Sequence, residues 1–166
     1  EWVGVSVTMP GKFAALQFAD DATERATLVG SANTLVRTVA GWHADNTDID
    51  GVVGALAGTS VSDRAVVVGS GGTAPAVVVG LVQLGAKHIT VAARNAEKAA
   101  PTVDLAIRCG AHAQWCDVGD AQQLADEVAE TGVIVNTVPA DAVARYAATL
   151  ALAPVLLDAI YDPWPT

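Results

Sequence analysis

Cysteine and basic residues are scarce in this chain of 166 residues. Its two cysteines, Cys109 and Cys116, are too few for a disulfide framework and have no histidine at metal-ligand spacing. We therefore predict reduced thiols and no metal site. Nine Lys and Arg residues stand against 18 Asp and Glu residues, which gives a formal net charge of −9. This acidic balance, without any basic cluster, argues against a nucleic-acid partner.

Long apolar runs are missing as well. No run reaches the roughly 18 residues of a membrane-spanning helix, and no secretory leader is recognisable, so the sequence predicts a cytoplasmic protein with no membrane partner. The chain is nevertheless rich in apolar side chains, with 52% hydrophobic and only 16% charged residues. That composition is enough for the core of one large domain or two small ones.

A glycine-rich stretch, read VVVGSGGTA over residues 66–74, organises the rest of the chain. A short β-branched strand is followed by the spacing G-x-G-x-x-A and then by an apolar helix. In a dinucleotide-binding turn, the first glycine allows a sharp turn, the second lets backbone N–H groups approach a pyrophosphate, and the third small residue lets helix and strand pack. We predict that a pyrophosphate binds at this helix N-terminus. The contacting residues would be Gly69, Ser70, Gly71, Gly72, Thr73 and Ala74.

Strands and helices alternate regularly after Arg64. We predict strands at 65–68, 89–92, 113–116, 133–136 and 155–158, separated by helices at 73–84, 96–108, 121–129 and 142–152. Apolar strands between amphipathic helices indicate an α/β fold with a doubly wound parallel sheet, the Rossmann arrangement, in its standard strand order. Ligands of such sheets bind beyond the carboxyl ends of the strands, where 69–73 and 136–139 would both lie.

The end of the second of these strands indicates the cofactor. An acidic residue about twenty positions after the glycine turn would favour NAD, but the strand ends in Ala92-Ala93-Arg94-Asn95 without a carboxylate. Arg94 can contact a 2′-phosphate, and Asn95 can cap the next helix while donating a hydrogen bond to the cofactor. Lys98, one turn further, can assist in binding the cofactor. The sequence therefore predicts NADP.

We interpret residues 1–57 as a partial substrate-binding domain and residues 58–166 as the dinucleotide-binding domain. The first part should hold a strand at 2–7, a helix capped by Thr8 with Lys12 in its first turn, a short helix at 22–27, a hairpin turning at 40–41 and a helix at 49–57. A lysine in a first turn is opposed by the helix dipole, and such departures are more common at functional sites, although a solvated surface lysine is the alternative. The polar cluster Asp45-Asn46-Thr47-Asp48 either caps the next helix or converges on a small hydroxylated ligand.

Six motifs occur in the order found in shikimate dehydrogenases, over essentially the whole chain. They are Val7-Thr8-Met9-Pro10-Gly11-Lys12, Gly30-Ser31-Ala32-Asn33-Thr34, Asp45-Asn46-Thr47-Asp48, Gly69-Ser70-Gly71-Gly72-Thr73-Ala74, Ala93-Arg94-Asn95 and Asp158-Ala159-Ile160-Tyr161-Asp162-Pro163. The chain resembles that family most specifically in V-T-x-P-x-K followed by a distant N-T-D.

The resemblance implies reversible hydride transfer between NADP and a ring carbon, interconverting 3-dehydroshikimate and shikimate. Lys12 and Asp48 match the catalytic pair of the family, and the sequence leaves open which of them carries the proton. Ring hydroxyls of the substrate would be bound at positions matching Thr8 and Asn33, and Tyr161 matches a position near the substrate. The side of the nicotinamide would be lined by Thr137 and Val138.

The sequence also departs from the family pattern. Ser6 stands where many relatives have asparagine, and Gly11 where a bulkier residue is common. Because the opening and closing segments of the family are not matched, we expect this piece to bind NADP better than it turns over substrate. Two alternatives stay open: an NAD-dependent quinate/shikimate dehydrogenase, which should carry the missing acidic residue, and a non-catalytic dinucleotide-binding module. The residues leave the oligomeric state open, a homodimer included.

Overall fold

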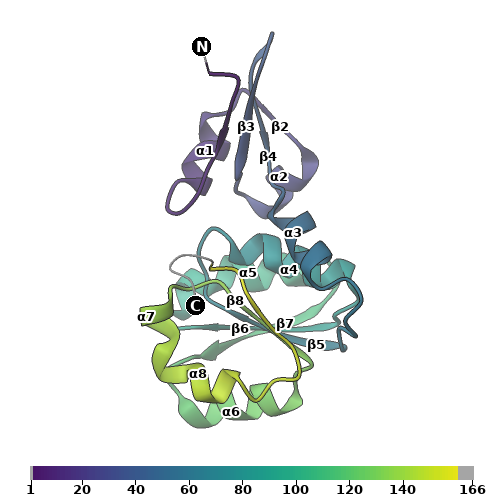
Figure 1. The fold of residues 1–166 in the computed structure, drawn as a ribbon, viewed down its shortest axis with the longest axis vertical. Helices are drawn as coiled ribbons and strands as arrows, with labels where there is room; N and C mark the ends of the chain where they lie inside the picture. Colours follow the sequence, from purple (N-terminus) through teal and green to yellow (C-terminus); the bar gives the residue numbers. More distant parts are fainter. Residues whose placement is uncertain (1, 161–166) are drawn as a thin grey trace.

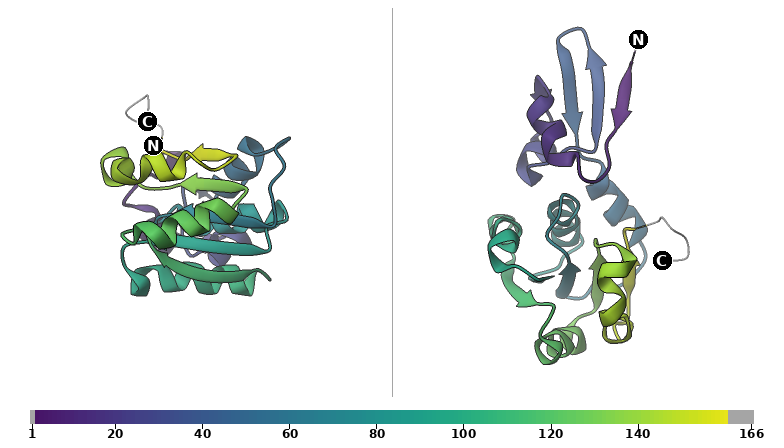
Figure 2. Two further views of the ribbon diagram at one scale, coloured as in Figure 1. Left: turned by 90° about the horizontal axis from the view of Figure 1, so that it is seen from below. Right: turned by 90° about the vertical axis from the view of Figure 1, so that its left-hand side faces the viewer.

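The computed structural model describes residues 2–160 and arranges them around two sheets (Figure 1). The smaller sheet comes from the N-terminal third of the chain, and helix α3 (Asp48–Ala55) leads from it into the larger sheet. The right-hand view of Figure 2 shows the smaller sheet set off to one side of the larger unit. Within the described residues, no helix is long and apolar enough to cross a membrane.

The larger sheet has five parallel strands in the order β7-β6-β5-β8-β9. Their bounds are β5 (Arg64–Val68), β6 (His88–Ala93), β7 (His112–Asp117), β8 (Val133–Asn136) and β9 (Leu156–Asp158). The chain enters this sheet at the central strand β5, continues outward through β6 to β7, and then crosses to the other side of β5 to form β8 and β9. This order confirms the doubly wound parallel sheet that the sequence predicted.

Helices cover both faces of this sheet because its strands are apolar on both faces. One core contains Ala65 and Val67 and is closed by α4 (Ala74–Gln83) and α5 (Ala96–Arg108). The other contains Val66 and Val68 and is closed by α6 (Ala121–Glu130) and the segment before β9. Successive residues of β5 thus enter opposite cores, as the twofold repeat of a strand requires.

The continuous helix predicted at 142–152 is wrong. The segment forms α7 (Ala140–Val143), the 3₁₀ turn η1 (Ala144–Tyr146) and α8 (Ala147–Leu150). Val143, Tyr146 and Leu150 all pack on the core beneath α6. A 3₁₀ turn aligns residues three apart, so the tighter winding brings Val143 and Tyr146 onto the same core. Alanine favours a continuous helix by its intrinsic propensity, so the packing of Val143, Tyr146 and Leu150 on the core overrides local preference here.

The smaller sheet is mixed, with strand order β1-β3-β4-β2. Its elements are β1 (Gly4–Ser6), α1 (Lys12–Phe18), β2 (Asp21–Ala22), α2 (Glu24–Val29), β3 (Thr34–Thr38) and β4 (Gly41–Asp45). The predicted N-cap Thr8 is wrong, because Gly11 occupies that position. The backbone N–H of Gly11 donates to the carbonyl of Thr8 and closes a turn, which delays the helix until Lys12.

Helix α3 packs against the larger unit although it follows the smaller sheet directly. Ile49, Val52 and Leu56 are buried in the same core as α4 and β5. The helix that carries Asp48 is therefore anchored on the glycine-turn domain. The predicted domain boundary after residue 57 stays a proposal.

Candidate active site

Lys12 and Asp48 form a hydrogen-bonded ion pair where the two units meet. Lys12 is the first residue of α1 and Asp48 the first residue of α3. The Lys12 Nζ donates to Asp48 Oδ2 over 2.6 Å, and the two side chains are 12% and 22% exposed. Both are thus partly withdrawn from water yet reachable, which suits a proton-transferring pair.

The other oxygen of Asp48 is held by Asn33. The Asn33 Nδ2 donates to Asp48 Oδ1 over 2.8 Å and to Thr47 Oγ1 over 3.0 Å, while Asn33 Oδ1 accepts from the Thr47 backbone N–H over 2.9 Å. Thr47 precedes α3, but its side chain makes no capping hydrogen bond. The structure agrees with convergence of the polar cluster at one place. The predicted capping by Thr47 is wrong, whereas Asn46 Oδ1 accepts from the backbone N–H of Asp48 at the start of α3.

The glycine turn lies directly against this pair. Lys12 Nζ also donates to Thr73 Oγ1 over 2.8 Å, and Ser31 Oγ donates to the Gly72 carbonyl over 3.1 Å. A Cβ added at Gly72 would lie 3.4 Å from Lys12 Cβ, within van der Waals contact, so the lysine stem passes directly over the turn. Four residues from three of the predicted motifs, Lys12, Asp48, Gly72 and Thr73, therefore meet at one point.

A pocket of about 200 Å³ opens beyond the carboxyl ends of β5, β6 and β8. Of the predicted cofactor residues, Gly69, Ser70, Gly71, Arg94 and Val138 line it. The other lining residues are Val68, Ala92, Ala93, Val118, Ala142 and Tyr146. The pocket lies at the sheet edge where ligands of doubly wound folds bind.

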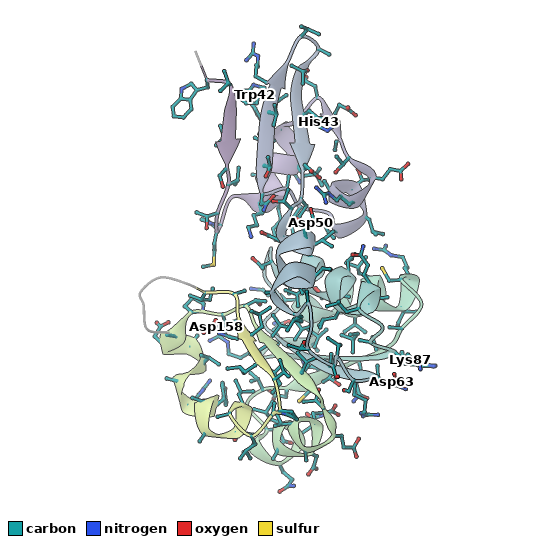
Figure 3. The ribbon with its side chains drawn as sticks, turned by 45° about the vertical axis from the view of Figure 1, so that its right-hand side comes forward. Trp42, His43, Asp50, Asp63, Lys87 and Asp158 are labelled. Carbon is teal, nitrogen blue, oxygen red and sulfur yellow. The ribbon has the colours of Figure 1, made fainter. Side chains whose placement is uncertain are left out.

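Gly69 illustrates why the turn needs glycine. Its φ is +107°, and an added Cβ would lie 2.5 Å from Thr137 Oγ1 and 2.7 Å from Val138 Cγ1. Both the backbone conformation and the space exclude a side chain. The loop that lies against Gly69 contains Thr137 and Val138 and is held by Asn136. The Asn136 Nδ2 donates to the carbonyl of Val138 and to Oδ1 of Asp158, which is labelled in Figure 3.

The remaining predicted site residues in the described part of the chain do not line this pocket. Thr137 is buried and its hydroxyl donates to the Val68 carbonyl over 2.8 Å. Asn95 caps α5 by accepting from the Lys98 backbone N–H, and the exposed Lys98 is not among the pocket residues. Ala74 is buried at the start of α4. Thr8 is exposed in the turn before α1, and Tyr161 lies outside the described residues.

Three residues at the site were not identified by the sequence reasoning. Ser31 and Asn46 are fully buried, and Asn46 links Ser31 to the Asp48 backbone N–H. Both stood in quoted motifs, so position alone could have marked them. Tyr146 lines the pocket, and its hydroxyl is buried with no hydrogen-bond partner in residues 2–160. No sequence signal pointed to it.

An arginine braces the segment that leads to Asp48. Arg25 binds both oxygens of Asp45 and also Asp50, which is labelled in Figure 3 near the start of α3. The hydrogen bonds from Arg25 hold the pKa of Asp45 well below its usual range, although desolvation acts in the opposite direction. The brace therefore keeps its charge at neutral pH and ties α2, the end of β4 and α3 together.

The two cysteines take no part in this arrangement. Cys116 is buried, and burial raises the pKa of its thiol to about 11, so it is protonated at neutral pH. Cys109 is partly buried. No group of three or more His, Cys, Asp or Glu side chains in the described part of the chain could hold a metal ion.

Two family models match the chain. The Shikimate dehydrogenase substrate binding domain matches residues 1–35, and the Saccharopine dehydrogenase NADP binding domain matches residues 65–152. Among curated proteins, the Shikimate dehydrogenase (NADP(+)) of Microcystis aeruginosa is 35% identical over 139 residues, which are 82% of this chain and 48% of that protein. That of Methylobacterium radiotolerans is 35% identical over 176 residues, covering 98% and 60%.

Solved structures resemble the chain more closely. The shikimate dehydrogenase of Mycobacterium tuberculosis is 65% identical with a TM-score of 0.90, over 100% of this chain and 62% of that one. The shikimate 5-dehydrogenase of Mycobacterium fortuitum is 63% identical with a TM-score of 0.84, over 100% and 61%. The chain thus spans about half to three-fifths of the length of the relatives named here. These similarities run through both sheets and through the motifs that build the site, and we conclude that the chain belongs to the shikimate dehydrogenase family.

Proposed function

We propose that the whole protein is an NADP-dependent shikimate dehydrogenase, an oxidoreductase of aromatic amino acid and chorismate biosynthesis. It would interconvert 3-dehydroshikimate and shikimate by reversible hydride transfer. The observation that carries this proposal is the Lys12–Asp48 pair, joined over 2.6 Å beside the glycine turn. The curated relatives named above are NADP(+) enzymes, which supports the choice of cofactor.

The residues around the pocket suit a phosphorylated dinucleotide. Backbone N–H groups of the turn at Gly69–Gly71 would bind its pyrophosphate at the start of α4, where the helix dipole favours an anion. Arg94 would bind the 2′-phosphate from the pocket wall. NADPH, when bound, supplies the hydride.

The ion pair then handles the proton. As the ketone is reduced, negative charge develops on its oxygen, and a donor within hydrogen-bond reach stabilises that charge and protonates it. Lys12 and Asp48 would deliver this proton as a unit, and in the oxidation of shikimate they would accept it. Asn33 donates to Oδ1 of Asp48, the oxygen that Lys12 does not bind. It would orient the carboxylate and bind a ring hydroxyl of the substrate.

The main alternative is a quinate dehydrogenase. One from Corynebacterium glutamicum, solved with NAD, is 29% identical with a TM-score of 0.72, over 83% of this chain and 50% of that one. Arg94 and the absence of a carboxylate at residues 92–95 favour NADP. A non-catalytic module is disfavoured because such a protein has no need of the Lys12–Asp48 pair. A cytoplasmic location and a homodimer stay predictions from the sequence.

Replacing the lysine tests the proposal. In the complete protein, Lys12→Ala should lower kcat for NADP reduction by shikimate by about 10² to 10⁴, the usual contribution of a general acid or base, while NADP affinity changes little. Lys87→Ala is the matched control, because Lys87 pairs with Asp63 at the opposite edge of the sheet (Figure 3). Full turnover by Lys12→Ala, or faster oxidation of quinate with NAD than of shikimate with NADP, would refute it.

A further inference from the structure

The hydroxyl of Thr73 is used in an unusual way. Thr73 is the N-cap residue of α4, and threonine in that place normally accepts a hydrogen bond from the first turn of its own helix. Its side chain makes no capping bond. Instead, Thr73 Oγ1 accepts from Lys12 Nζ over 2.8 Å, across 61 positions of sequence. The hydroxyl that could stabilise its own helix is directed to the other unit.

This contact completes the restraint of the lysine. A lysine side chain is flexible, and one carboxylate partner leaves its ammonium free to move around that carboxylate. In this structure Asp48 and Thr73 accept from two of the three N–H groups, and the lysine stem passes directly over Gly72. Within residues 2–160 the third N–H has no partner, so the two contacts fix the direction in which it points.

We propose that Thr73 is a positioning residue for Lys12. By accepting a hydrogen bond from the ammonium, its hydroxyl aims the remaining N–H at the substrate oxygen, while its backbone stays part of the turn that binds the pyrophosphate. The inference rests on the proposed function of Lys12. It goes further because it assigns the hydroxyl of a residue in the glycine turn to the proton-transferring pair instead of to the dinucleotide.

Two substitutions in the complete protein separate these roles. Thr73→Val keeps the shape but removes the acceptor, and Thr73→Ser keeps the acceptor. We expect Thr73→Val to lower kcat about tenfold with the Kd for NADP, measured by fluorescence titration, within twofold of wild type. Thr73→Ser should restore kcat to within about twofold. Thr27→Val, which removes an exposed hydroxyl on α2, is the control and should change neither quantity.

Three results would overturn the inference: unchanged kcat in Thr73→Val, a loss of NADP affinity as large as the loss of kcat, or failure of Thr73→Ser to restore kcat. A readout without turnover separates this failure from failure of the proposed function. In denaturant unfolding, Lys12→Met and Thr73→Val should be non-additive if the hydrogen bond exists. If the two changes in the free energy of unfolding are additive, the inference about Thr73 is refuted and the proposed function is not. If the wild-type protein is inactive with shikimate, the proposed function is refuted and the hydrogen bond is not.

Discussion

At the scale of residues, the site depends on each partner of Asp48 coming from a different segment. Lys12 lies in α1 and Asn33 precedes β3, and each donates to one carboxylate oxygen. With both oxygens engaged, the carboxylate cannot rotate freely, and its charge stays beside the ammonium. Hydrogen bonds to charged groups are about twice as strong as neutral ones, so this small network can hold a defined geometry.

Tyr146 offers a prediction about stability at the same scale. Its hydroxyl is buried without a partner in the described residues, which costs about 1 to 3 kcal/mol of desolvation. Tyr146→Phe should therefore raise the free energy of unfolding in urea by about 1 kcal/mol and leave NADP affinity unchanged. Tyr146→Leu is the matched variant, because it removes the ring as well as the hydroxyl. The ring packs on the core that contains Val66 and Val68 and lies under Arg145, so this variant should destabilise the protein.

A different outcome would assign the hydroxyl to the ligand. If Tyr146→Phe weakens NADP binding about tenfold while stability stays unchanged, the hydroxyl finds its partner on the dinucleotide. The prediction of a stability gain without a binding effect would then be wrong.

At the scale of elements, the α3–α4 contact places Asp48. A Cβ added at Gly80 of α4 would lie 3.0 Å from Val52 Cγ1 and 3.1 Å from Val52 Cβ. In an exposed helix, Gly→Ala stabilises by roughly 0.5 to 1 kcal/mol, but overpacking a core costs about 1 to 3 kcal/mol. We therefore expect Gly80→Ala to lower the free energy of unfolding by about 1 kcal/mol and to lower kcat, because α3 must shift.

Gly54→Ala serves as its control. Gly54 lies on the exposed side of α3, and nothing would come within 4 Å of its Cβ. This variant should gain stability of about 0.5 to 1 kcal/mol and keep its kcat. Denaturant unfolding and steady-state kinetics on both variants check the pair. If Gly80→Ala raises the free energy of unfolding instead, α3 can shift to accommodate the methyl group without loss of stability.

Most elements of the larger unit could be predicted from the sequence. The strand at 133–136 and the helix at 96–108 are observed with those bounds, because apolar runs and Asn95 mark their ends. Two features could not be predicted. The start of α1 depends on a backbone turn between Thr8 and Gly11, and the break in 142–152 depends on packing against a core formed by distant strands.

At the scale of the whole molecule, a dinucleotide should stabilise the 166-residue chain. NADP at about 100 times its Kd adds roughly 2.7 kcal/mol to the free energy of unfolding, or several degrees in Tm. NAD at the same concentration should add much less, because it gives Arg94 no 2′-phosphate to bind. Differential scanning fluorimetry measures both shifts, and Arg94→Ala should remove the difference. Equal shifts in the wild-type chain would rule out selection by Arg94.

The sequence by itself determined the doubly wound sheet, the position of the glycine turn and, through a family resemblance, the pairing of Lys12 with Asp48. The sheet and the turn are local features, because apolar periodicity and glycine spacing are written in neighbouring residues, whereas the pairing followed from the order of the motifs along the chain. Only the tertiary structure decided that Thr73 and Ser31 contact the other unit, and that α3 is anchored on α4. Such contacts join residues far apart in the chain, and they depend on how two sheets pack, which no local pattern encodes.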